Sequence, residues 1–249
     1  MSAAHSPAGD SLALAGDSFA DRSVTELARL LEHPAIWRGR SAARPEVLPS
    51  GCAAFDACLP GGGWPRTGLI EILVSRFGVG ELYLLFPALA ALTRRPAARW
   101  CVWVAPPLEP YAPALSAHGA VLERMLVVRP SVQRGNPQRG RPPESLWAFE
   151  QTLGSGASDI ALAWATRSPR ARAIRRLQLA AERGKSLGVL FRPLQAARES
   201  SAAALRVVVE PLADGTTADG ARITLLKSRG GARGSIDLRW ADGWSTSGS

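Results

Sequence analysis

Lysine is almost absent from this chain, which has two lysines and 28 arginines in 249 residues. The formal net charge is still +9, so the basic side chains are nearly all guanidinium groups. A basic surface permits contact with nucleic acid. Coding bias toward arginine, alanine, glycine and proline produces the same composition, and the charge alone leaves both interpretations open.

Long apolar runs are also missing. No segment approaches the roughly 18 to 20 uncharged apolar residues of a membrane helix, so we expect no membrane span. Asp10 and Asp17 interrupt the N-terminal residues, and no basic segment precedes them, which argues against a secretory signal. Cys52, Cys58 and Cys101 are an odd number without ligand-like pairing. We interpret them as buried thiols of a cytoplasmic protein.

Composition divides the chain into four parts. Residues 1–22 are rich in alanine, serine and glycine, and we expect them to be disordered. Residues 23–45 are expected to form a short helix and a linker, residues 46–241 the core, and residues 242–249 a flexible tail. The helix has an apolar stripe that is a candidate partner-binding surface: Leu27, Leu30 and Leu31.

Strand-like and helix-like segments alternate through most of the core. The expected strands are 69–74, 100–105, 125–129, 159–165 and 187–191, and the expected helices are 81–93, 112–118, 144–153 and 170–185. A turn-rich connector is expected at 48–68 and a surface loop at 131–143. Apolar strands separated by helices indicate an α/β fold with a parallel sheet covered on both faces. Strands at 204–210, 222–227 and 235–240 predict an antiparallel extension at one edge.

Two resemblances agree with this pattern. The segment SGCAAFDACLPGGGWPRTGLIE, residues 50–71, resembles the entry to the ATPase core of RecA, and the order of the later segments fits. This implies a RecA-like three-layer core. A narrower resemblance is to the ImuA family, whose members are RecA-like proteins encoded with an inducible-mutagenesis polymerase cassette. The strings that carry it are LPGGGWPRTGLIEIL, GVGELYLLFPALAAL, WVAPPLEPYAPALSAHG, RRLQLAAERG and LLKSRGG.

The residues that would bind ATP in a RecA-like core are replaced. A P-loop reads G-x-x-x-x-G-K-[ST], where backbone amides and the lysine hold phosphate and the hydroxyl binds Mg²⁺. The matching stretch here contains Gly78, Gly80, Glu81 and Leu82, with glutamate at the lysine position and leucine at the hydroxyl position. A carboxylate repels a triphosphate. We therefore predict a degenerate P-loop that binds neither a nucleotide cofactor nor a metal.

The resemblance to RecA implies that ATP-related groups are also replaced at three further positions. Pro106 occupies the place of the glutamate that orients water, and Trp164 that of the Walker B aspartate. The nucleotide-sensing Asn-Gln pair is replaced within Leu190–Pro193. Catalytic residues are thus expected to be absent, and the resemblance implies a protein that is not an enzyme.

Two basic features remain. The resemblance places Lys227 and Arg229 where RecA has two lysines that reach the nucleotide site of the neighbouring subunit. Residues i and i+2 of a strand point to one side, although an ordinary exposed basic strand has the same pattern. The arginine-rich helix is either a solvated surface or a DNA contact. Such a contact would use Arg167, Arg170, Arg172, Arg175 and Arg176.

The resemblance to the ImuA family implies an accessory function in damage-induced (SOS) translesion DNA synthesis and mutagenesis. The implied partners are an inactive Y-family polymerase homologue, RecA and an error-prone replicative-type polymerase. The alternative is a relative of SulA, a cell-division inhibitor that binds the tubulin-like division protein. The missing lysine, glutamate and aspartate disfavour an active RecA-type ATPase.

Overall fold

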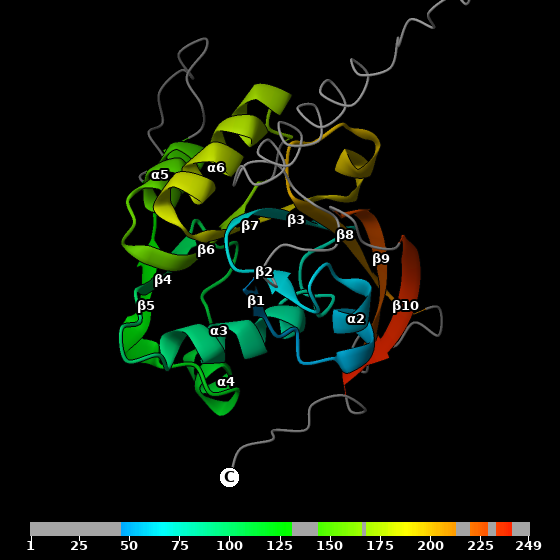
Figure 1. Cartoon of the computed structure of the whole chain (residues 1–249), viewed down its shortest axis with the longest axis horizontal. Coiled ribbons are helices and arrows are strands. Elements are labelled where there is room, and N and C mark those ends of the chain that lie inside the picture. The colour runs from blue at the N-terminus through cyan, green and yellow to red at the C-terminus, as the bar shows by residue number, and fades with distance from the viewer. Residues whose placement is uncertain (1–45, 131–143, 166–167, 213–219, 229–232, 241–249) are drawn as a thin grey trace, which may run out of the picture. The chain divides into compact units, whose positions relative to one another are not determined.

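The computed structural model describes residues 46–130, 144–165, 168–212, 220–228 and 233–240, all within the compact unit Arg44–Ser249 (Figure 1). Several sequence predictions lie outside these residues: residues 1–45 with Leu27, Leu30 and Leu31, the loop 131–143, Arg167, Arg229 and residues 242–249.

The central sheet has eight strands in the order β10-β9-β8-β3-β7-β6-β4-β5. Their bounds are β3 (Gly68–Val74), β4 (Trp100–Val104), β5 (Met125–Val128), β6 (Ser158–Trp164), β7 (Leu187–Pro193), β8 (Leu205–Pro211), β9 (Gly220–Ser228) and β10 (Gly234–Arg239). Strands β3 to β8 are parallel to one another. Strands β9 and β10 continue the sheet antiparallel from β8. The predicted α/β fold with a mainly parallel sheet and antiparallel C-terminal strands is confirmed.

Helices cover both faces of the sheet (Figure 1). The helices α5 (Glu144–Gly154) and α6 (Ala171–Gly184) lie on one face, and α2 (Ala53–Cys58), α3 (Phe86–Thr93) and α4 (Ala112–Ala117) lie on the other. Three short 3₁₀ turns complete the described elements: η1 (Tyr83–Leu85), η2 (Leu122–Arg124) and η3 (Leu194–Arg198). None of the helices in the described part of the chain has the length and apolar character needed to cross a membrane.

Strand β3 lies at the centre of the sheet and is buried along its whole length. Its side chains alternate between the two faces, as a pleated strand requires. Ile70 and Ile72 pack into the larger apolar core with α3, whereas Leu69 packs into the core beneath α5 and α6. Gln178 of α6 fixes the helix to this strand, because its Oε1 accepts the Leu69 N–H at 2.9 Å.

Helices α5 and α6 are in tight contact at their C-terminal ends. A Cβ atom on Gly184 would lie 1.9 Å from the carbonyl oxygen of Leu153, so only glycine fits at this contact. The next residue, Lys185, has a φ of 50° and ends α6 in the left-handed conformation.

Three sequence predictions need correction. The helix expected at 81–93 begins only at Phe86 after the turn η1, because Pro87 belongs in the first turn of a helix. The expected connector 48–68 contains α2 and a small antiparallel sheet of β1 (Val47–Leu48) and β2 (Trp64–Pro65). The segment at 204–210 is β8, which pairs parallel with β3 and antiparallel with β9.

Candidate functional site

The loop that follows β3 is closed by one of its own side chains. Gly78 and Gly80 have φ angles of 85° and 95°, which glycine adopts without strain. The carboxylate of Glu81 folds back over this loop and accepts the N–H groups of Gly78 and Val79, each at 2.9 Å. In P-loop proteins such amides bind phosphate oxygens. In this loop the acceptor is the carboxylate of a buried glutamate.

An aromatic side chain from the far end of the described chain covers the same loop. A Cβ atom on Gly80 would lie 2.4 Å from Cζ2 of Trp240, so the indole lies directly against this glycine. Trp240 also stacks on Tyr83 with ring centroids 5.0 Å apart. Phe86 stacks on His118 at 4.3 Å beside them, and burial lowers the pKa of His118. Leu82 is half-buried and packs against the same core.

Aromatic packing occupies the end of β6, where the resemblance to RecA places a metal-associated aspartate. Trp164 is buried and stacks between Trp103 of β4 and Phe191 of β7, with centroid distances of 5.5 and 4.8 Å. Within the described residues, no group of three or more histidine, cysteine, aspartate and glutamate side chains is placed to hold a metal ion.

The loop after β4 presents large apolar side chains to solvent. It begins at Ala105, whose φ of 50° is unusual for a residue with a side chain, and continues with Pro106. Leu108 and Tyr111 follow, and they are 77% and 70% exposed. Sequence reasoning assigned no function to these two residues. The unusual string APPLEPYAPAL, which holds four prolines, was the signal that marked the loop.

A buried charge cluster lies at the centre of the sheet, and sequence reasoning missed it. Glu71 of β3 accepts a hydrogen bond from Arg192 of β7 at 2.7 Å and one from Arg206 of β8 at 2.6 Å. The Glu71 and Arg192 side chains are completely buried. Arg192 also bonds the carboxylate of Glu199 at 2.6 Å. The hydrogen bond with Ser168 is the main reason why the pKa of Glu199 is lowered, and Arg192 adds to it.

The charge cluster connects the sheet to the turn η3. Arg206 donates to the carbonyl oxygens of Ala196 and Glu199 at 2.6 and 2.8 Å. Each charged group therefore meets an opposite charge or a backbone acceptor, as burial of ions requires. The sequence carried a signal for this cluster, because Glu71, Arg192 and Arg206 stand inside or directly after apolar strands. The stretch Leu190–Pro193, where the resemblance to RecA places the nucleotide-sensing pair, thus holds an arginine of this buried cluster.

The remaining basic candidates lie on β9 and on or next to α6. Lys227 lies on β9 and donates to the carbonyl oxygen of Ser201 at 2.7 Å. Its proposed companion Arg229 is outside the described residues. Four arginines of the predicted DNA contact are exposed on or next to α6: Arg170, Arg172, Arg175 and Arg176.

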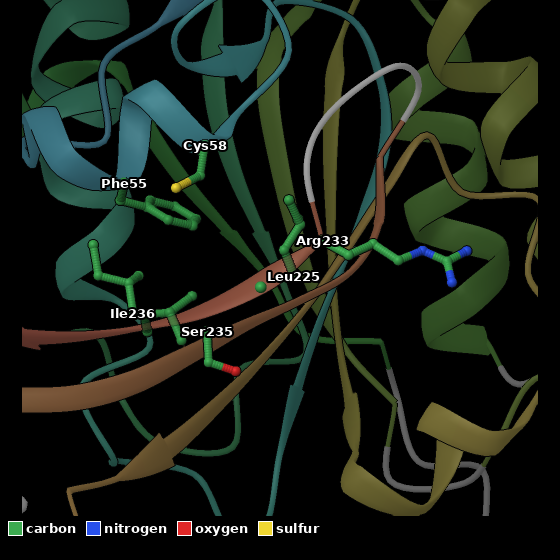
Figure 2. Close-up of a pocket in the computed structure, with 8 residues that line it drawn as sticks. Phe55, Cys58, Leu225, Arg233, Ser235 and Ile236 are labelled. Carbon is green, nitrogen blue, oxygen red and sulfur yellow. The ribbon is translucent and has the colours of Figure 1, made fainter.

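A shallow apolar pocket lies between α2 and the hairpin of β9 and β10 (Figure 2). Phe55 and Cys58 line it from α2, and Leu225 and Ile236 line it from the strands. Arg233 reaches away from its centre. Its lining is mainly apolar, so the pocket offers packing surface above all.

Known proteins similar to this chain include two SulA proteins. The cell division inhibitor SulA of Edwardsiella piscicida is 31% identical over 135 residues, which cover 52% of this chain and 70% of the relative. The crystal structure of SulA from Pseudomonas aeruginosa matches at 25% identity with a TM-score of 0.38, over 50% of this chain and 97% of that one. No protein-family profile matches the sequence.

Proposed function

The chain belongs to the SulA family, and from this premise we propose that it is a non-catalytic protein of the response to DNA damage that acts by binding other proteins. One observation supports the proposal that the protein is non-catalytic. The amides of Gly78 and Val79, which would hold phosphate in an ATPase, bind the carboxylate of Glu81 instead. A triphosphate would have to displace this carboxylate and overcome its charge.

The direct test is calorimetric titration of the full chain with Mg²⁺-ATP. We expect no saturable binding and no turnover, and a dissociation constant in the low micromolar range would overturn the proposal. Glu81→Lys is the informative variant. It restores the P-loop lysine but leaves Pro106 and Trp164 in place of the catalytic and metal-associated groups, so it should not create an ATPase.

We further propose that the partners are those of translesion synthesis: an inactive Y-family polymerase homologue, RecA and an error-prone replicative-type polymerase. The strings shared with the ImuA family support this finer assignment, and one of them forms the loop with Leu108 and Tyr111. Prolines limit the freedom of this loop, so little conformational entropy would be lost when it binds. Exposed aromatic residues on a rigid loop are frequent anchors of protein interfaces.

A second candidate is inhibition of cell division, because the relative that is 31% identical carries that name. Both candidates predict protein contacts without catalysis, so they differ only in the partner. Pull-down of the purified chain against the polymerase homologue, RecA and the tubulin-like division protein separates them. Capture of the division protein alone would favour the second candidate.

Variants of the loop after β4 provide a matched comparison in the same pull-down. Leu108→Ser combined with Tyr111→Ala should reduce capture of the partner at least tenfold without lowering the melting temperature, since both side chains are exposed. Leu126→Ala removes an exposed leucine from the edge strand β5 and serves as the control. Equal capture by the parent and the loop variant would exclude this loop as the contact.

A further inference from the structure

The outer face of α6 carries a concentration of positive charge. Arg172, Arg175 and Arg176 are exposed there, while the opposite side of the helix is buried against the sheet. Arg176 forms an ion pair with Glu150 of α5. In the described part of the chain, neither Arg172 nor Arg175 has an ion-pair partner. Two guanidinium groups thus remain available to an external anion.

An exposed tryptophan lies on the neighbouring helix α5. Helices α5 and α6 each connect two parallel strands in succession, so they run side by side in the same direction (Figure 1). The ion pair of Arg176 with Glu150 shows that these sides of the two helices face each other. One turn earlier on each helix stand Arg172 and Trp147, and residues three or four apart share a helix face. The Trp147 side chain is 56% exposed.

We propose that this outer face of α5 and α6 binds single-stranded nucleic acid, with Arg172 and Arg175 on phosphates and Trp147 stacked on a base. Arginine and an exposed flat aromatic ring are the two elements that single-strand binding combines. In a duplex the bases are already stacked, so the indole would add nothing. An acidic peptide would engage the arginines but offers no flat base for the indole. This inference is separate from the proposed protein contacts.

The test is fluorescence anisotropy of a labelled oligothymidine of about 20 nucleotides with the full chain at several salt concentrations. Arg172→Glu with Arg175→Glu should weaken binding at least tenfold and lower the salt slope by about 0.7 for each phosphate that the protein no longer neutralises. Trp147→Ala should weaken it roughly 5- to 100-fold with little change in slope, because stacking involves no counterion release. Trp147→Phe should retain most of the affinity.

The matched control is Arg95→Glu with Arg124→Glu, which changes the net charge equally at exposed sites away from this face. It should keep affinity within a few-fold of the parent. Equal weakening in both double variants would mean that only overall charge attracts the oligonucleotide, and the proposal would fail. It would also fail if Trp147→Ala binds normally, or if a duplex or polyglutamate binds as tightly as the single strand. Melting temperatures establish that each variant is folded.

Failure of the proposed binding of single-stranded nucleic acid can be distinguished from failure of the proposed function. The pull-down experiments are performed after nuclease treatment and use variants of the loop at Leu108 and Tyr111, which leave α5 and α6 unchanged. Weakened oligonucleotide binding in the helix variants with normal partner capture is the result expected from two separate surfaces.

Discussion

Two buried glutamates ten residues apart illustrate different ways of placing a carboxylate inside this protein. Glu71 lies within the central strand and is neutralised by the guanidinium groups of Arg192 and Arg206. Glu81 lies in the loop that follows and accepts two backbone N–H groups. The first is held by charges that are themselves buried, and the second by uncharged donors of a loop.

The difference predicts what each carboxylate leaves behind when it is removed. Removing Glu71 leaves two buried cations with reduced compensation, which costs more than an unpaired amide. Removing Glu81 leaves two uncharged amides of a loop without their acceptor. We therefore interpret Glu71 as a fold-determining residue and Glu81 as an internal substitute for a bound anion.

The largest expected effect is that of Glu71→Ala. The variant should lose about 3 to 5 kcal/mol of unfolding free energy, because Arg192 and Arg206 remain buried without their common counterion. Urea denaturation followed by circular dichroism measures this change. Glu71→Gln retains hydrogen bonding but not the charge, so it should be less harmful. If Glu71→Ala is as stable as the parent, the cluster does not stabilise the fold.

Asp159 lies between the two cases, because it is held both by guanidinium groups and by a backbone amide. Its carboxylate accepts the N–H of Arg99 at 2.8 Å and pairs with the side chains of Arg99 and Arg66. Burial raises its pKa, but these hydrogen bonds and charges outweigh burial and lower it overall. Asp159→Asn should cost about 2 to 3 kcal/mol near neutral pH.

The pH dependence of the same variant is a second readout. A lowered folded pKa means that Asp159 stabilises the protein above its unfolded pKa of about 3.9 and loses this effect as the pH falls through the folded value. The difference in melting temperature between the parent and Asp159→Asn should therefore shrink below about pH 4. A difference that stays constant down to pH 2 would contradict this assignment.

Glu81→Ala is expected to have a smaller effect on stability and a gain in binding. It should cost about 1 to 2 kcal/mol, since two amides lose a charged acceptor. In return the loop should bind sulfate or phosphate, detected as a rise in melting temperature with the anion that the parent does not show. Gly78→Ala is unsuitable as a control because its φ is positive. Arg76→Ala, which changes an exposed residue of the same loop, is suitable.

The smallest effect belongs to Glu199, whose side chain is 44% exposed. The hydrogen bond with Ser168, followed by Arg192, lowers its pKa. Its contribution is thus present above the unfolded pKa of about 4.3 and disappears as the pH falls through the folded pKa. Glu199→Gln should lower the melting temperature slightly at pH 7 and leave it unchanged at pH 2 to 3. An equal decrease at both pH values would show that charge is unimportant at this position.

The sequence predicted the strands well because each is an apolar run bounded by turn residues. Two of the errors have local causes. The strand expected at 187–191 extends to Pro193, since Arg192 is charged yet buried against Glu71. The helix expected at 81–93 starts late, and Pro87 within it was the overlooked signal. The parallel pairing of β8 with β3 is a matter of topology that no local pattern contains.

For the candidate site, the sequence predicts which chemical groups are missing but not what the side chains at those positions contact. The identity of Glu81 is visible in the sequence, whereas its return to the amides of Gly78 and Val79 depends on glycine φ angles. The contact of Trp240 with Gly80 joins residues 160 positions apart and needs the complete sheet. Exposure of Leu108 and Trp147 likewise follows from packing and not from residue type.

The position of β3 in the sheet has a consequence for synthesis on the ribosome. This strand emerges early, yet both of its neighbours, β7 and β8, come more than a hundred residues later. Until residues 187–211 have left the exit tunnel, an almost wholly apolar strand has no place in a sheet. Such non-local pairing slows folding and exposes strand edges to aggregation. Newly made chains should therefore depend on a chaperone that shields β3.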